Sequence, residues 1–141
     1  MGYVDWVVLT VNVVWFGLGF RLFALKPRKA VRLLVTPASN EESSRKALVD
    51  SLPFLGGLNL GFVALSGGQI FASVRYGSAA SWTVFFASAV AHATQFAGNL
   101  PNALRGGRSG GASWDVLRGP MLVIFVGDAT CALAKVVALA L

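Results

Sequence analysis

The segment at residues 90–102, VAHATQFAGNLPN, carries polar side chains that could do chemistry inside an otherwise apolar stretch. It contains the only histidine, His92, together with Gln95 and Asn99. A histidine exchanges protons near neutral pH, and an amide both donates and accepts hydrogen bonds. Asp128 interrupts a later apolar stretch, where a carboxyl must be neutralised, paired or hydrated. Together, His92 and Asp128 predict a pair for general acid–base chemistry.

Polar residues in each of the four apolar stretches fall on one face when the stretch is projected as a helix. The faces carry Asp5, Asn12 and Gly19 in the first stretch; Asn59, Ser66, Gln69 and Ser73 in the second; Ser88, His92, Gln95, Asn99 and Asn102 in the third; and Asp128, Cys131 and Lys135 in the fourth. Polar groups facing lipid are costly, so these faces should turn inward and meet. Counted along the helices, Asn59, His92 and Asp128 reach one level, about 10 to 12 Å from the same end.

These positions predict a polar site in that half of the molecule. We expect His92 and Asp128 to carry acid–base catalysis, and the following residues to contact a substrate: Asn59, Gln95, Asn99, Asn12, Gln69 and Trp15. The alternative for Asn12, Ser66 and Ser88 is hydrogen bonding between helices, and for His92 it is a neutral, buried imidazole with satisfied hydrogen bonds.

Lys135 shares a face with Asp128 but is expected to extend to the far membrane interface, as long cationic side chains do. The alternative is a charge pair with Asp128 across a hydrated cavity. One histidine and one cysteine, Cys131, make a poor ligand set, so no metal site, cofactor or internal disulfide is predicted. A haem held by two histidines would need a symmetric dimer.

The elements that must position these residues are four apolar segments, at about residues 4–25, 52–72, 81–100 and 120–141. Each has about 20 residues, the length that a helix needs to cross a bilayer. The chain has 141 residues, of which 55% are hydrophobic and only 13% charged, far fewer charges than soluble domains carry. The predicted fold is an all-α polytopic membrane protein, a single transmembrane domain (residues 1–141) built as a four-helix bundle.

Small residues predict where these helices approach one another. Gly57 and Gly61 lie four residues apart, and Ala87, Ala91 and Gly98 line one ridge of the third segment. Ridges of this kind allow close packing in membranes. The short connection after residue 72 further predicts that the second and third segments are antiparallel neighbours.

Basic residues predict the orientation. Nine of them lie in residues 26–51 and 101–119, whereas the connection between the second and third segments has only Arg75. The positive-inside rule makes the two basic loops cytoplasmic and both termini extracytoplasmic, in the cell (inner) membrane. The expected partner of the net charge of +6 is the anionic lipid surface rather than nucleic acid. RKAVRLLV, residues 28–35, is expected to lie along that surface as a short amphipathic turn.

The leading functional hypothesis is an intramembrane site that binds or converts a lipophilic small molecule, by isomerisation, cyclisation or oxidation. One alternative is a small homo-oligomeric, proton-coupled transporter or channel with Asp128 as its coupling group. Another is an accessory subunit of a membrane complex, whose polar residues serve assembly. The residue types do not decide whether the protein is an enzyme.

Overall fold

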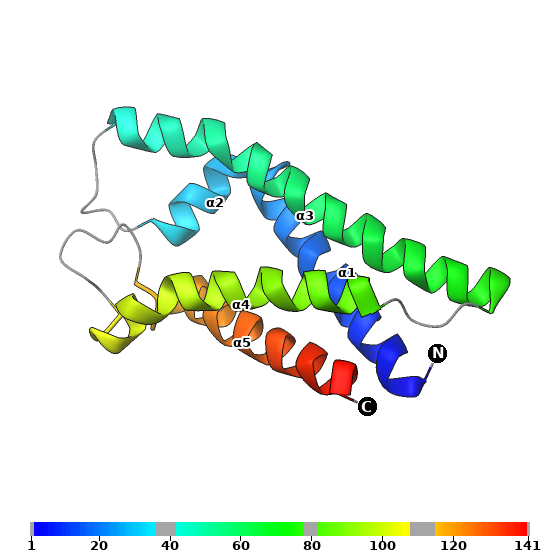
Figure 1. Ribbon diagram of the computed structural model, residues 1–141. Helices are drawn as coiled ribbons and strands as arrows, with labels where there is room; N and C mark the ends of the chain where they lie inside the picture. The colour runs from blue at the N-terminus through cyan, green and yellow to red at the C-terminus, as the bar shows by residue number, and fades with distance from the viewer. Residues whose placement is uncertain (1, 36–41, 78–81, 108–114, 141) are drawn as a thin grey trace.

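All the secondary structure of the described residues is helical. The computed structural model describes residues 2–35, 42–77, 82–107 and 115–140, and within these ranges it has no strand (Figure 1). The helices are α1 (Tyr3–Phe23), α2 (Pro27–Leu34), α3 (Glu42–Tyr76), α4 (Trp82–Leu104) and α5 (Gly119–Ala140). The predicted all-α class is therefore confirmed. Parts of both predicted loops, residues 36–41 and 108–114, lie outside the described residues.

Three of the described helices are long and apolar enough to cross a membrane: α1, the Arg45–Tyr76 part of α3, and α5. Large apolar side chains on their outer surfaces, such as Phe71 (62% exposed) and Leu133 (64%), suit contact with lipid. α4 is as long, but its histidine and amides make it less apolar. The membrane-protein class is thus supported, whereas a four-helix membrane bundle is not confirmed.

The helices pack as two pairs. α1 runs along α3, and α4 runs along α5, while α1 and α5 connect the pairs. α3 and α4 follow each other in sequence but have few contacts, so the prediction that they are close neighbours is wrong. In Figure 1, α1 begins and α5 ends on the right, which we call the terminal end. The opposite end, where α2 lies beside the start of α3, is called the loop end.

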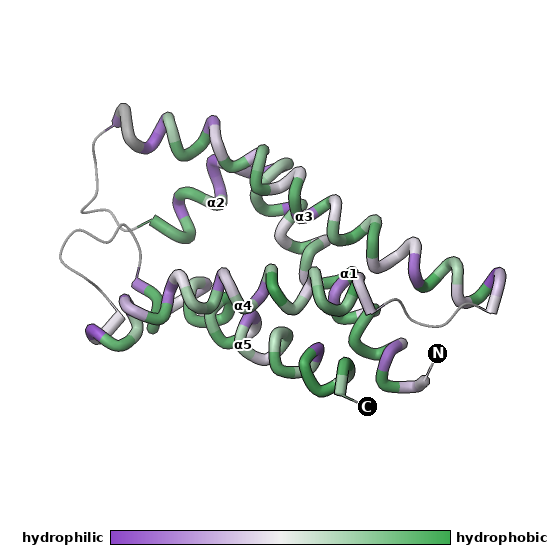
Figure 2. Tube along the Cα trace, in the orientation of Figure 1, coloured by the Kyte–Doolittle hydropathy of each residue, from purple (hydrophilic) through white to green (hydrophobic). Residues whose placement is uncertain are grey.

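A short amphipathic helix forms within the segment predicted as the first loop. α2 starts at Pro27, a residue suited to the first turn because its missing N–H has no intrahelical partner to lose. Ala30 and Val31 are buried, while Arg28 and Arg32 are exposed. Figure 2 shows hydrophilic colouring on α2, in contrast to the mostly hydrophobic tubes of α1 and α5. The predicted amphipathic turn is thus a full helix that packs against α1, α3 and α5.

The main apolar core lies at the terminal end. It consists of Val8 and Leu9 of α1 and Phe85 of α4, all buried. Partly buried side chains from α3, α4 and α5 pack around them: Ile70, Val84, Ala134, Ala138 and Leu139. This cluster joins four of the five helices.

Close helix contact occurs at glycines other than the predicted ones. A Cβ built on each of three glycines would meet a neighbouring helix: Gly19 faces Asn59, Gly56 faces Ala24, and Gly127 faces the Trp15 ring. At Gly56 the nearest atoms include the backbone nitrogen of Ala24, 2.5 Å away, so even one methyl group would not fit.

The predicted close contacts are absent at the three glycines of the ridges. A Cβ on Gly57, Gly61 or Gly98 would have nothing within 4 Å, so these glycines are not points of close contact and the prediction is wrong. Spacing by four residues identifies a ridge but not the direction in which it points. The inward side of α3 is the one that carries Gly56 and Asn59.

Candidate functional site

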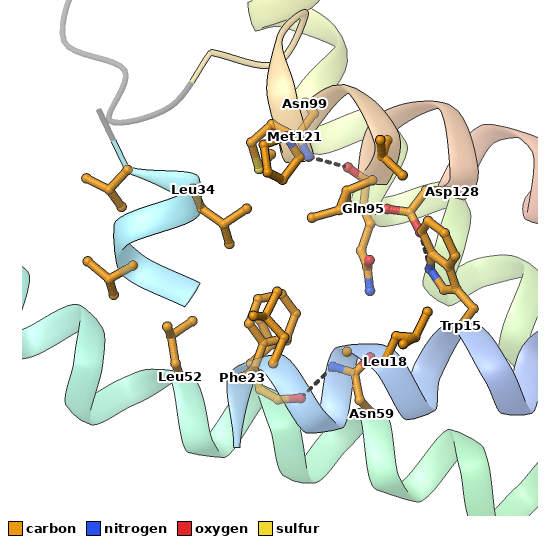
Figure 3. Close-up of a pocket in the computed structure, with 18 of the residues that line it drawn as sticks. Trp15, Leu18, Phe23, Leu34, Leu52, Asn59, Gln95, Asn99, Met121 and Asp128 are labelled. Carbon is orange, nitrogen blue, oxygen red and sulfur yellow. Dashed lines mark hydrogen bonds between the residues drawn. The ribbon is translucent and has the colours of Figure 1, made fainter. Parts of the chain in front are cut away.

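A pocket of about 730 Å³ lies at the loop end and takes residues from all five helices (Figure 3). Its walls are mostly aliphatic: Leu18, Leu22, Val31, Leu34, Val35, Leu48, Leu52, Leu55, Val123 and Ile124, with Phe23, Met121, Gly19 and Pro120. Five side chains with polar groups complete the lining: Trp15, Asn59, Gln95, Asn99 and Asp128. The pocket is partly open, and its volume is in the range of small-molecule sites.

Asp128 is the only acidic residue in this lining, and it is fully buried. Its Oδ1 accepts a hydrogen bond from the Trp15 indole N–H at 3.2 Å and lies 2.8 Å from Nδ1 of His92. Its Oδ2 has no hydrogen-bond partner among the described residues. Native proteins rarely leave a buried carboxylate oxygen unpaired, so this oxygen calls for a donor that the described residues do not supply.

His92 lies behind Asp128 and does not line the pocket. It is fully buried, and its ring packs on Phe16, with the ring centres 4.7 Å apart. Its second nitrogen, Nε2, lies 3.4 Å from Oδ1 of Asn12, a long contact. Of the two residues predicted to do acid–base chemistry, only Asp128 borders the pocket, and its side chain is covered from solvent.

The contacts of His92 extend to a third helix. Asn12, fully buried, donates from Nδ2 to the Ser66 hydroxyl at 3.2 Å. With the amide in this orientation both ring nitrogens of His92 face oxygen atoms, the arrangement that suits a protonated imidazolium. A neutral imidazole can also be hydrogen-bonded by the same residues. In that case the Asn12 amide is rotated by 180°, so that its N–H group faces Nε2 of His92. The network therefore holds His92 in either protonation state.

The predicted substrate-binding residues divide into two groups. Trp15, Asn59, Gln95 and Asn99 line the pocket, whereas Asn12 and Gln69 do not. Figure 3 shows the Gln95 side chain extending into the pocket. Asn59 and Asn99 donate to backbone carbonyl groups one turn earlier, at 2.8 and 3.0 Å. Both amide groups are therefore tied to the backbone of their own helices within the lining.

Residues of the predicted first loop form one side of the pocket, which sequence reasoning missed. Val31, Leu34 and Val35 come from α2 and its end, and Leu48 comes from a part of α3 that precedes the predicted span. The signal was present in the alternation of basic and apolar residues in RKAVRLLV, which marks a helix with one apolar side.

Lys135 departs most from expectation. It is only 1% exposed, and its Nζ donates to the backbone carbonyl of Cys131 at 3.1 Å. The prediction that it extends to the far interface is wrong. Helical side chains lean toward the N-terminal end of their helix, and Lys135 lies on the buried face of α5 with Asp128 and Cys131. The amino group therefore turns back toward Asp128.

The chain shows no detectable similarity to characterised proteins. No protein-family model matches it, and neither a curated protein nor a solved structure is significantly similar. Among the described residues, no three His, Cys, Asp or Glu side chains come together as a metal site would require. The function must therefore be inferred from the side chains around the pocket and their geometry.

Proposed function

We propose that the protein binds a lipophilic small molecule at the loop end and acts on it through Asp128. The observation that carries this proposal is the unpaired Oδ2 of a fully buried carboxylate that lines an apolar pocket. A ligand with an apolar body and a hydrogen-bond donor at one end would fill the pocket and, once the side chains that cover Oδ2 move aside, satisfy that oxygen. Ligand sites commonly have this form, with apolar walls and a few convergent polar groups.

The walls suggest how such a ligand would lie. Its apolar body would pack between leucines of α1, α2 and α3 and the start of α5. The amides of Gln95, Asn59 and Asn99 lie along the same space and could hold a carbonyl or a second hydroxyl group. The donor end would reach Asp128, beside Trp15.

The proposed chemistry is proton transfer at Oδ2 of Asp128. A proton would leave an O–H or an activated C–H of the ligand and bond to Oδ2, while the electron pair stays on the ligand. Trp15 and His92 hold Oδ1 and thereby orient the carboxylate. His92 is then a positioning residue, since it touches Asp128 rather than the ligand. Isomerisation, cyclisation or the proton step of an oxidation would use this arrangement.

The proposal includes a membrane setting in which α4 is the fourth crossing helix. Its polar residues would be tolerated because the stripe turns inward: His92 and Ser88 are buried, and Gln95 lines the pocket. The nine basic residues of the loop-end segments support a cytoplasmic loop end with both termini outside. The pocket would then lie in the cytoplasmic half of the bilayer.

Retention of a bound compound tests the proposal. The full chain is purified in lipid nanodiscs, and organic extracts are compared by mass spectrometry for the parent, Met121→Trp and Val126→Trp. Met121 lines the pocket, whereas Val126 is exposed on the same helix and does not. We expect a compound in the parent and in Val126→Trp that Met121→Trp has lost. A parent that retains nothing beyond bulk lipid, or equal retention in all three proteins, contradicts the proposal.

A further inference from the structure

Lys135 is a second buried charged residue on the same face of α5 as Asp128. The two residues are seven positions apart, which is about 10 Å along the helix axis. No carboxylate of the described residues lies within ion-pair distance of Nζ, and its one described hydrogen bond goes to the Cys131 carbonyl. An ammonium has three protons to donate, so this one bond leaves two of them unmatched, and a nearby negative charge would offset the cost of burying the cation. Asp128 is the buried carboxylate available for that role.

The charges of the buried groups limit what the pocket can accept. The buried ionisable side chains of the described residues, apart from the thiol of Cys131, are His92, Asp128 and Lys135. With Lys135 protonated and Asp128 ionised, their sum is zero when His92 is neutral and positive when it is an imidazolium. In either state the one negative charge is already matched. A cationic ligand would leave a net positive charge in a medium that solvates charge poorly.

We infer that the ligand is an uncharged amphiphile that presents a hydroxyl group to Oδ2 of Asp128, and that Lys135 is the positioning residue that disfavours amines. The inference rests on the proposed function and specifies its substrate class. A carboxylate ligand is disfavoured as well, because it lacks a proton for Oδ2 and would be repelled by Asp128.

A hydroxyl group also matches the donors and acceptors around it. Its proton would go to Oδ2 of Asp128, and its oxygen would remain free to accept from a nearby N–H. The Gln95 amide, which extends into the pocket and makes no hydrogen bond within the described residues, is placed to donate it (Figure 3). A long-chain alcohol or a phenol with an apolar tail fits both requirements.

The inference is tested with two probes of equal chain length, 1-dodecanol and dodecylamine. Binding of each to the full chain is measured in phosphatidylcholine nanodiscs for the parent, Lys135→Gln and Lys46→Gln. Lys46 is exposed on α3, so its substitution removes the same charge at the surface. We expect the parent and Lys46→Gln to bind the alcohol at least tenfold more tightly than the amine. In Lys135→Gln this preference should fall at least tenfold or reverse.

The outcomes separate the inference from the proposed function. A parent that binds neither probe overturns both. A parent that binds both probes equally, or a preference unchanged in Lys135→Gln, overturns the role of Lys135 and the substrate class while leaving the pocket as a ligand site.

A second variant covers the case in which Lys135→Gln does not fold. Lys135→Gln combined with Asp128→Asn removes both buried charges, so it should fold and bind the two probes with similar affinity. A double variant that keeps the parent's preference for the alcohol contradicts the inference.

Discussion

The two ends of the bundle are built from the same helices but differ in what fills them. At the terminal end, Val8, Leu9 and Phe85 form a packed apolar cluster. At the loop end the helices separate around a pocket lined by Asp128 and three amides, and α2 forms one side. We attribute stability mainly to the terminal end and ligand binding to the loop end. The two should respond to different mutations.

The boundary between the two ends is a buried polar network rather than an apolar layer. Ser66 of α3, Asn12 of α1, His92 of α4 and Asp128 of α5 are linked in sequence by two hydrogen bonds and the longer contact between His92 and Asn12. Each helix contributes one residue, so the network fixes the relative positions of all four. It also brings the carboxylate to the pocket with one oxygen held and the other free.

The largest effect is expected at the terminal end. Phe85→Ala removes a side chain that is 3% exposed in the apolar cluster and should lower the free energy of unfolding by about 3 to 5 kcal/mol. Phe86 is the neighbouring residue and is 47% exposed, so Phe86→Ala serves as the control with little effect. Denaturant titration in detergent measures both. If Phe85→Ala instead weakens ligand binding without loss of stability, the division between the two ends is wrong.

Asp128→Asn should reduce ligand binding directly, which Phe85→Ala should not. It keeps the shape of the side chain but replaces the free acceptor, so ligand affinity should fall by about 1.5 to 3 kcal/mol, the range for a hydrogen bond to a charged group. Stability should fall in this single variant, because Lys135 then keeps a buried charge without a compensating carboxylate, and it should return to the parent level or above in the double variant with Lys135→Gln. Binding isotherms and thermal melts of the same preparations separate the two effects.

A double variant tests whether His92 acts through Asp128. If His92 acts only by positioning Asp128, His92→Gln combined with Asp128→Asn should lose little more activity than Asp128→Asn alone. Losses that add, and that follow the melting temperature, would instead mean that both residues serve only to hold the helices together.

Gly56→Ala tests how the loop end is held without an apolar cluster. The added methyl group would meet the backbone of Ala24, so α1 and α3 must move apart, at a cost of about 1 to 3 kcal/mol. Gly57→Ala is matched in helix and chemistry, and its methyl group would meet nothing within 4 Å. Equal stability of the two variants would show that α1 and α3 do not approach closely at this point.

The smallest effect is expected from Trp15→Phe. This change keeps an aromatic side chain in the pocket wall but removes the N–H that donates to Oδ1 of Asp128. Affinity should fall by about 0.5 to 1.5 kcal/mol, because the bond to His92 still orients the carboxylate. A loss of affinity as large as that of Asp128→Asn would contradict this expectation. It would mean that the Trp15 N–H contributes as much to ligand binding as the free oxygen of Asp128.

Helical periodicity was sufficient to predict which residues turn inward. Ser88 and His92 of the α4 stripe are buried, as are Asn12 and Asp128, because a polar side chain among apolar neighbours has one favourable direction. Periodicity could not predict which helix each face meets. Asn12 therefore reaches Ser66 and His92 rather than the pocket, and the predicted glycine ridge at Gly61 packs on nothing.

The place of α2 in the pocket and the direction of the Lys135 side chain both depend on how the helices pack together, which the sequence of one segment does not determine. Basic residues in the predicted first loop suggested a surface segment, yet the apolar side of α2 forms part of the pocket. Lys135 was expected at an interface because lysine chains are long enough to reach one. Its direction is set instead by the inward orientation of the α5 face that it shares with Asp128.

The most direct test of the central claim is a high-resolution structure of the full chain in native-like lipid, inspected at the loop-end pocket. The claim predicts density for an elongated molecule in the pocket, with a polar atom within about 3 Å of Oδ2 of Asp128, the distance of a hydrogen bond. A pocket closed by its own side chains, with Oδ2 bonded to one of them, would contradict it. So would a lipid chain that makes no polar contact with Asp128.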